Sequence, residues 1–476
     1  MTDVTNIRQA ILSTPLETSN FGHAPNEENL YLPASHTKAL RLDSYLVVGS
    51  RGVGKSFWTA ALSSNELRSL IGTTIKELDH TDVWVGFSEK SKIDQYPSAP
   101  TFSKLLHDNN GEAYDIWGAV VLRWIANLLD FAIPSESWQE TVSWIKKDPE
   151  CIARLMESAN EKLSQEKRSG LIVFDALDRS SNDWRTMDQI VRDLLRIALW
   201  LKPYSNLHAK IFLRSDQFER TVTNFPDASK LLATKADIAW MRHDLHGLLW
   251  QQLINAPDEH GEVLRSLYAR EIGDIPIKHK NVWQIPSGMK KESHLRDLFQ
   301  SLAGPWMGRD RRRGVPYTWA VGHLADGLGQ TSPRSFLAAI MQATEDSIQR
   351  YPQHEYALHY ESIKRGIQKA SDIRVAEVAE DYPWITDVLS VLSGMNVPCD
   401  KDNILDRWNM AFPNGPNGIS SDKLPAQHAD RGWQGIEEDL VRLGLIEFKK
   451  DGRMDMPDLY RVGFKLGRKG GVKPNH

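Results

Sequence analysis

The sequence predicts an α/β protein with a parallel sheet, followed by an all-α region and a C-terminal domain of winged-helix type. Short apolar segments rich in strand formers alternate with segments of helical periodicity, which is the pattern of strand-helix-strand units. Most of these apolar segments end in a glycine or a charged residue. Because the carboxyl ends of parallel strands meet at one edge of a sheet, we expect a ligand site there. Near the C-terminus, three helical segments and two short strands predict the winged helix.

Each expected element has its own local pattern. The expected strands are, in chain order, Ser44–Val48, Val83–Val85, Leu171–Phe174 and Ala209–Leu213. Helical spacing of apolar residues predicts helices over Phe57–Leu70 and Met187–Leu201. The two short C-terminal strands are expected around Ile446–Phe448 and Leu459–Val462.

Length and composition limit the protein class. At about 150 residues per domain, 476 residues predict roughly three domains. A composition of 41% hydrophobic and 25% charged residues excludes wholesale disorder, and a net charge of -4 restricts any DNA contact to a local basic patch. Two cysteines, Cys151 and Cys399, are too few for a disulfide scaffold. With a polar N-terminus and no apolar run of about 20 residues, we expect a soluble, cytoplasmic protein without membrane contact.

Shifts in pattern predict four segments along the chain. They are an N-terminal arm at 1–41, an α/β core at 42–236 with a helical insertion at about 110–168, a helical lid at 237–376, and a winged-helix-like domain at 377–476.

A glycine-rich segment between the first strand and the first helix fits the pattern G-x-x-x-x-G-K-[ST] of a phosphate-binding loop. Its glycines let consecutive backbone N–H groups point toward phosphate oxygens, Lys55 adds a mobile positive charge, and Ser56 is the expected Mg²⁺ ligand. The predicted nucleotide-binding residues are Gly49, Ser50, Arg51, Gly52, Val53, Gly54, Lys55 and Ser56. The alternative is a glycine turn that only joins strand and helix.

A second acidic site follows the strand Leu171–Phe174. Asp175 lies directly after four apolar residues, where a P-loop protein places the carboxylate that acts with Ser56 on Mg²⁺. Asp178 is the candidate for orienting the attacking water, because Ala176 stands where many ATPases have a glutamate. The competing interpretation of Asp178 is a helix N-cap or an ion pair with Arg179.

These motifs resemble those of the STAND and KAP-like branch of AAA-type P-loop ATPases. The shared features are the GSRGVGKS loop, the LIVFDALD segment, a strand that ends in arginine (KIFLRSD) and the segment Ser332-Pro-Arg-Ser-Phe336. The resemblance, which spans about 43–340, implies that Arg214 senses the γ-phosphate and that Arg334 is a second arginine sensor on the lid. Both arginines have the alternative role of surface or ion-pair residues.

Two basic regions are candidate contact surfaces. Arg309-Asp-Arg-Arg-Arg313 can reach a neighbouring subunit's γ-phosphate or a nucleic-acid backbone, with a solvated loop as the alternative. From residue 447 onward, eight lysines and arginines stand against four acids. A winged helix with this charge can bind DNA phosphates or serve as a regulatory protein module.

The sequence therefore predicts an ATP- and Mg²⁺-binding, ATP-hydrolysing switch protein. The resemblance implies a homo-oligomer, a protein effector such as a nuclease, and a role in prokaryotic antiviral defence. The main alternative is a DNA-associated AAA-type loader or initiator that acts through its winged helix. A metabolic P-loop kinase and a scaffold that binds nucleotide without hydrolysis are further alternatives.

Overall fold

The computed structural model describes residues 4–16, 25–218, 221–279, 281–286, 288, 290–419, 421 and 423–474. Contacts divide the chain into two compact units. The sheet unit comprises Leu32–Ala239 and a short segment that ends at Pro25. The helical unit comprises the N-terminal residues, Asn26–Tyr31 and everything from Trp240 onward. The break at 239/240 lies close to the predicted end of the α/β core.

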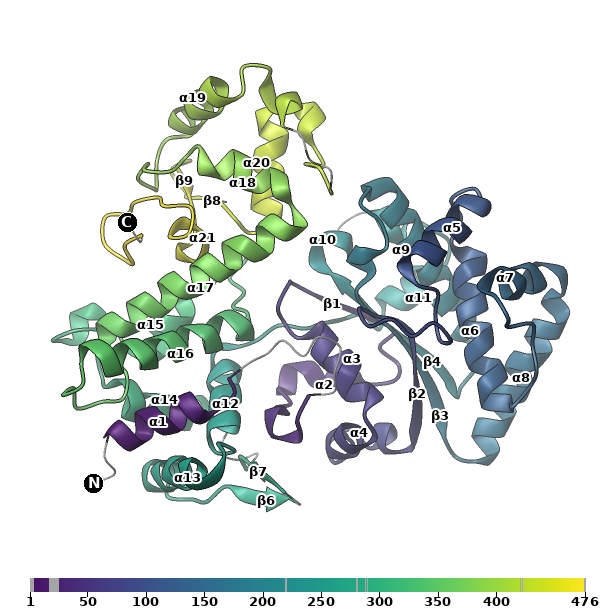
Figure 1. The fold of residues 1–476 in the computed structure, drawn as a ribbon, viewed down its shortest axis with the longest axis horizontal. Helices are drawn as coiled ribbons and strands as arrows, with labels where there is room; N and C mark the ends of the chain where they lie inside the picture. The colour runs from purple at the N-terminus through teal and green to yellow at the C-terminus, as the bar shows by residue number, and fades with distance from the viewer. Residues whose placement is uncertain are drawn as a thin grey trace. The chain divides into compact units, whose positions relative to one another are not determined.

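A five-stranded parallel sheet forms the centre of the sheet unit (Figure 1). Its strands are β1 (Leu46–Gly49), β2 (Thr81–Phe87), β3 (Ser169–Phe174), β4 (Leu207–Arg214) and β5 (Ala236–Asp237), in the order β2-β3-β4-β1-β5. All four pairings are parallel. This confirms the predicted α/β fold class, and it places the carboxyl ends of β1, β3 and β4 at one edge.

Helices cover both faces of this sheet, which explains why its central strands are continuous apolar runs. Figure 1 shows α3 and α4 on one side of the strands and α6, α8 and α9 on the other. The helices of this unit are α2 (Thr37–Leu40), α3 (Lys55–Ser63), α4 (Asn65–Gly72), α5 (Ala99–Asp108), α6 (Tyr114–Leu129), α7 (Trp138–Lys147), α8 (Pro149–Gln165), α9 (Trp184–Leu201), α10 (Ser215–Phe218) and α11 (Ser229–Leu232). The predicted helical insertion corresponds to α6, α7 and α8.

The helical unit is discontinuous in sequence. Its helices are α1 (Val4–Ser13), α12 (Arg242–Leu253), α13 (Asp258–Ile272), α14 (Glu292–Ala303), α15 (Pro316–His323), α16 (Pro333–Arg350), α17 (Tyr360–Asp381), α18 (Pro383–Ser390), α19 (Lys401–Ala411), α20 (Trp433–Arg442) and α21 (Asp458–Arg461). Its short strands are β6 (Ile277–His279), β7 (Val282–Gln284), β8 (Glu447–Phe448) and β9 (Met454–Asp455). The antiparallel pair β6–β7 corrects the expectation that 237–376 is all-α, because three-residue strands leave no periodic signal.

The N-terminal helix α1 belongs to this unit. Arg8 is 1% exposed, and its guanidinium donates to the backbone oxygens of Tyr351, Pro352, Tyr356 and Ala357 at 2.9–3.0 Å. Arg8 thereby satisfies four carbonyls of the loop that follows α16. The N-terminal part of the predicted arm is thus hydrogen-bonded to a segment more than 340 residues later in the chain.

The C-terminal segment has the element order of a winged helix. After α18, Cys399 forms an antiparallel bridge with Met454; α19 and α20 follow, and then the hairpin β8–β9. The predicted second strand at Leu459–Val462 is wrong: β9 lies at 454–455, and 458–461 is helix α21. Pro457 precedes this helix, and Arg461 pairs with Asp458 one turn earlier.

The long helix α17 runs through the predicted boundary at 376/377. It continues to Asp381 because neither glycine nor proline interrupts it after Gly366 until Pro383. The hydroxyl of Ser371 donates to Leu459 O at 2.6 Å and accepts from Gly463 N at 2.8 Å. α17 is thus a rigid connection between the helical region and α21.

Candidate functional site

The segment Gly49–Ser56 forms a tight loop between β1 and α3, as the motif predicts. Gly54 has φ +100°, in the left-handed region, and directly precedes Lys55, the first residue of α3. At Gly49 a Cβ atom would lie 2.7 Å from Val53 Cγ2, so only glycine allows this close approach. The loop therefore points the N-terminus of α3 toward the carboxyl edge of the sheet, which favours bound anions.

Lys55 lies over this loop and is half-buried. Its ammonium donates to Gly49 O and Ser50 O, both at 2.9 Å. Burial and the positive charge of Arg214 lower the pKa of Lys55 to about 8, against the opposing charges of Asp175, Asp178 and Asp216. A lysine held by neutral carbonyls in a cluster of charges can exchange those carbonyls for phosphate oxygens.

Asp175 follows β3 and is 3% exposed. Its backbone N–H donates to Phe87 O at 2.9 Å, which fixes its position beside β2. Burial raises the pKa of Asp175, while a hydrogen bond with the Ser56 side chain and the charge of Lys55 lower it only in part. The two predicted metal ligands, Ser56 and Asp175, therefore lie close together.

The hydroxyl and carboxylate oxygens of Ser56 and Asp175 are of the kind that Mg²⁺ prefers. Among the described residues, no group of three or more His, Cys, Asp or Glu side chains could hold a metal. A P-loop site needs no such group, since the phosphates and water complete the metal's coordination.

Asp178 and Arg214 lie at the carboxyl ends of neighbouring strands and face each other. Ala176, with φ +57°, turns the chain sharply after Asp175. Arg214 Nη1 lies 3.5 Å from Asp178 Oδ2, and Arg214 Nε donates to Asp216 Oδ1 at 3.1 Å. The arginine side chain is 10% exposed and that of Asp178 29%. Sequence reasoning missed Asp216, although its position two residues after Arg214 was a usable signal.

The alternative partner of Asp178 is not observed. Arg179 pairs with Glu89 instead, and Ala176 rather than Asp178 occupies the N-cap position of the short helix Leu177–Arg179. Asp178 is therefore positioned by Arg214, beside Asp175 and Lys55.

Arg334 belongs to the helical unit. It lies in the first turn of α16, and its Nη1 donates to Glu377 of α17. Glu377 also accepts from Arg374 Nη1 at 3.1 Å, and Arg374 Nε donates to Tyr460 Oη at 3.2 Å. The ion-pair alternative for Arg334 is present, and its predicted contact with nucleotide stays a prediction.

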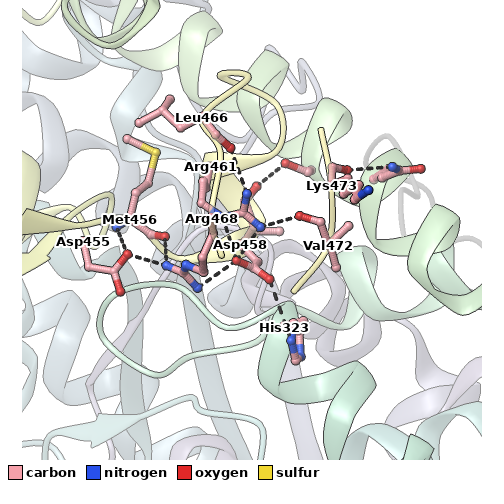
Figure 2. Close-up of polar contacts among 12 residues, drawn as sticks. His323, Asp455, Met456, Asp458, Arg461, Leu466, Arg468, Val472 and Lys473 are labelled. Atoms are coloured by element: carbon pink, nitrogen blue, oxygen red, sulfur yellow. Dashed lines mark hydrogen bonds and ion pairs between the residues drawn. The ribbon is translucent and has the colours of Figure 1, made fainter. Parts of the chain in front are cut away.

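The C-terminal charges divide into two groups. All four acids from 447 onward are paired, namely Glu447, Asp451, Asp455 and Asp458. Arg461, 0% exposed, donates to Asp458 Oδ1, Leu466 O and Val472 O, and Arg468 contacts Asp455, Asp458 and Met456 O (Figure 2). The excess positive charge is carried by four exposed lysines: Lys450, Lys465, Lys469 and Lys473.

Comparison with known proteins gives distant similarity only. No protein-family model matches the chain, and none of the curated proteins matches it. The chain is similar to the solved structure of the Aeropyrum pernix ORC1 protein in complex with DNA, at 14% identity and TM-score 0.36, with 91% of this chain and 92% of that chain covered.

It is also similar to the Aeropyrum pernix ORC2 protein. For the ADPNP–ADP complexes the identity is 11% and the TM-score 0.30, with 88% of this chain and 85% of that chain covered. For the ADP form the values are 12%, 0.33, 91% and 90%. TM-scores of this size carry no argument about function, so the proposal below rests on the site itself.

No helix in the described ranges has the length and apolar character to span a bilayer.

Proposed function

We propose that this chain is an AAA-type ATPase. It binds ATP and Mg²⁺ between Gly49–Ser56 and Asp175 and hydrolyses ATP to ADP and phosphate. The observation that carries the proposal is the convergence of the phosphate-binding loop with Asp175, Asp178 and Arg214 at one edge of the sheet. Lys55, the Ser56 and Asp175 side chains, and the Asp178–Arg214 pair supply the charged and polar groups that phosphoryl transfer requires.

Each residue has a distinct task in this proposal. The loop amides and Lys55 hold the β- and γ-phosphates, and Ser56 with Asp175 holds Mg²⁺. When bound, Mg²⁺ neutralises charge on the phosphate oxygens. Asp178 orients the attacking water, while Arg214, restrained by Asp216, donates to the γ-phosphate. The hydrogen bond from Arg214 to Asp216 keeps the guanidinium in place before negative charge develops on the γ-phosphate in the transition state.

Single-turnover hydrolysis tests this function and separates it from a nucleotide-bound scaffold. Asp178→Asn should retain ATP binding and lower the single-turnover rate by about a hundredfold, the effect expected for a water-orienting group. Arg179→Gln is the matched control. Arg179 is next to Asp178 in sequence but pairs with Glu89, so this substitution should leave the rate unchanged. Equal rates for wild type and Asp178→Asn would remove Asp178 from the mechanism; no turnover in wild type would favour the scaffold.

The switch role is supported by connections inside the helical unit. Arg334 is linked through Glu377 and Arg374 to Tyr460 of α21. An arginine that leaves Glu377 for a γ-phosphate would change the charge around Arg374. Nucleotide state would then bias the C-terminal domain, which we propose acts on a protein effector; the STAND or KAP-like branch and antiviral defence stay predictions.

DNA association is the second candidate, and the C-terminal domain favours it. The winged-helix-like domain carries four exposed lysines near its C-terminus, and lysines that neutralise phosphates make binding salt-dependent. Replacing Lys450, Lys465, Lys469 and Lys473 with Gln tests this more sharply than truncation, since truncation would remove the buried Arg461.

The lysine variant should lose duplex DNA binding and any stimulation of ATP hydrolysis by DNA. Its control carries four Gln substitutions at exposed lysines of the sheet unit: Lys76, Lys104, Lys147 and Lys167. If both variants bind DNA with the same dependence on salt, the C-terminal lysines are not the contact.

Self-association is the third part of the proposal. Arg309, Arg311, Arg312 and Arg313 are exposed, and the structure pairs none of them with a carboxylate among the residues it describes. The loop is ordered by the bond from Met307 N to Gly314 O at 2.9 Å, and Asp310 accepts from Arg312 N. ATPase activity per chain should therefore rise with protein concentration, and a flat specific activity together with a monomeric mass in ATP would contradict it.

A further inference from the structure

A second cavity lies in the sheet unit at the amino ends of β2 and β3, opposite the edge that carries the phosphate-binding loop. Its volume is about 430 Å³, within the range of small-molecule sites. Residues from α3, α4, β2, α6 and α8 line it, together with Arg168, which precedes β3. None of the residues proposed for ATP hydrolysis lines this cavity.

Three positively charged side chains line the cavity: Arg68, Lys162 and Arg168. Arg68 is 9% exposed and donates to Leu62 O at 2.7 Å and Asn65 Oδ1 at 2.6 Å, both neutral acceptors. Lys162 also donates to a neutral oxygen, Leu128 O, at 2.7 Å. These hydrogen bonds hold the two cations in place without neutralising them.

The carboxylates of the cavity do not balance this charge. Asp82 pairs with Arg168, and Glu166 is the other acid in the lining. Burial lowers the pKa of Arg68; the charge of Asp82 opposes this shift, the charge of Arg168 adds to it, and the charge of Glu66 opposes it. Arg68 and Arg168 line the same cavity, and an anion bound between them would offset their positive charges. Guanidinium groups bind phosphate through paired, parallel hydrogen bonds.

The half-buried residue Trp84 lines the same cavity, and so do Asn65 and Asn127. An indole ring offers a flat face for stacking, and two amide side chains offer donors and acceptors for a heterocycle. The chemistry of the cavity thus matches a phosphate group attached to a ring.

We propose that this cavity binds a small phosphomonoester that carries a ring, and that its occupancy is coupled to the nucleotide site. Helix α3 begins with Lys55 and ends with Ser63, which lines the cavity. Strand β3 starts directly after Arg168 and leads into Asp175. Strand β2 contributes Asp82 and Trp84 at one end, and at the other its Phe87 O accepts from Asp175 N. Three rigid elements therefore connect the two sites.

The binding test uses the full chain with Lys55→Ala, which disables the phosphate-binding loop. Titration calorimetry with AMP and with inorganic phosphate should show one saturable site. In that background, Lys162→Gln should weaken both probes by about tenfold, the loss expected for a charge-assisted contact. Trp84→Leu should weaken AMP but not inorganic phosphate. Lys104→Gln, an exposed lysine on α5, is the matched control and should change neither.

The outcomes separate the sources of the phosphate. Tighter binding of AMP supports the phosphomonoester, whereas equal binding of both probes with no effect of Trp84→Leu overturns the ring in favour of free phosphate. Absence of saturable binding, or binding that Lys162→Gln leaves unchanged, overturns the site.

The coupling rests on the proposed ATPase function and has its own measurement. In the wild-type chain, AMP held in the cavity should change ATP affinity, and ATP should change AMP affinity by the same factor, since coupling is reciprocal. Lys162→Gln should raise the AMP concentration needed for this effect by about tenfold and leave ATP affinity without AMP unchanged. AMP binding without any coupling overturns the effector role but not the site. If wild type and Lys55→Ala bound ATP equally, the ATP site assignment would fail while the AMP titration still stood.

Discussion

Asp175 and Asp455 are both buried aspartates in charged surroundings, yet their pKa values shift in opposite directions. At Asp455 burial alone would raise the pKa, but the hydrogen bond from Lys449 and the charge of Arg468 outweigh it and hold the pKa below its usual range. At Asp175 the Ser56 hydroxyl and Lys55 do not compensate for burial, and the pKa is raised. Asp455 forms ion pairs with Lys449 and Arg468, whereas Lys55 acts on Asp175 through its charge alone.

The difference distinguishes the charges around Asp455, which pair within the fold, from those around Asp175, which belong to the proposed nucleotide site. Around Asp455 and Asp458 the guanidinium groups of Arg461 and Arg468 donate to carboxylates and backbone oxygens (Figure 2). In the phosphate-binding loop, Lys55 donates to two backbone carbonyls, and Asp175, Asp178 and Asp216 act on it through their charges. Uncompensated buried charge lowers stability, and its location at the end of β3 indicates a functional site.

The largest expected effect is on the stability of the C-terminal domain. Arg461→Met removes the cation of a fully buried pair and leaves Asp458 and two backbone oxygens under-satisfied, so unfolding free energy should fall by about 3–5 kcal/mol. Chemical denaturation measures this loss. Arg453→Gln, which breaks an exposed pair with Asp451, should leave the midpoint unchanged. Similar losses in both variants would contradict the distinction between the two sites.

Asp175→Asn should have the opposite effect on stability and a large effect on activity. Because the pKa of Asp175 is raised, its ionised form destabilises the fold at neutral pH, and the neutral amide should raise the melting temperature. Turnover with Mg²⁺ should fall by about a hundredfold or more, since the carboxylate no longer acts with Ser56 on the metal. A lower melting temperature combined with normal turnover would make Asp175 structural.

Lys55 provides a test through pH. Lys55→Ala should weaken ATP binding by at least about tenfold, or about 1.4 kcal/mol. In wild type, ATP affinity should fall as pH rises above about 8, where Lys55 loses its proton, rather than near the ordinary lysine value. Fluorescence titration across this range measures the affinity. The pH dependence should be absent in Lys55→Ala, and its persistence there would assign it to another group.

The smallest expected effect concerns the two arginines proposed as phosphate sensors. Arg214→Ala and Arg334→Ala should each reduce the difference between ATP and ADP affinity by about fivefold while changing ADP affinity less, because only differential contacts shift a conformational equilibrium. Lys423→Ala, a partly exposed cation of the helical unit, serves as the control. Limited proteolysis of the ATP-bound and ADP-bound forms is a second measurement. If both variants keep the wild-type difference in affinity and in protease sensitivity between the two forms, these arginines are structural.

Acid should weaken the network around Asp455. Since the pKa of Asp455 is lowered on folding, its contribution is present above the unfolded carboxyl pKa and is lost as pH falls through the folded value. Asp455→Asn should therefore remove part of the acid sensitivity of unfolding, measured by circular dichroism. Unchanged acid sensitivity would show that Asp455 is not the group responsible.

Much of the sheet was predictable because its signals are local. Strands β1, β3 and β4 appear where apolar runs end in Gly49, Asp175 and Arg214. β5 was missed because two residues carry no periodic pattern, and its place is set by pairing with β1. α21 was mistaken for a strand because its four residues are too few to show helical spacing, whereas the Asp458–Arg461 pair acts only in the folded domain.

The sequence identifies the members of the candidate site but not the contacts between them. The motif identifies Lys55 and Ser56, and the run before Asp175 identifies that acid. That Asp178 meets Arg214 rather than Arg179 depends on the adjacency of β3 and β4, which sequence patterns do not give. Likewise, counting charges after residue 447 could not show that Arg461 is buried and that exposed lysines carry the excess.

The attachment of Arg8 has a consequence for how the protein is made. Its acceptors on the loop after α16 are up to 349 residues later in the chain, so at roughly 5–20 residues per second α1 waits about 17–70 seconds after its own synthesis. The whole of Leu32–Ala239 leaves the ribosome during that interval and can fold first. An expression fragment that starts at Trp240 would lack the helix whose arginine caps four carbonyls, whereas one spanning 32–239 keeps its sheet intact.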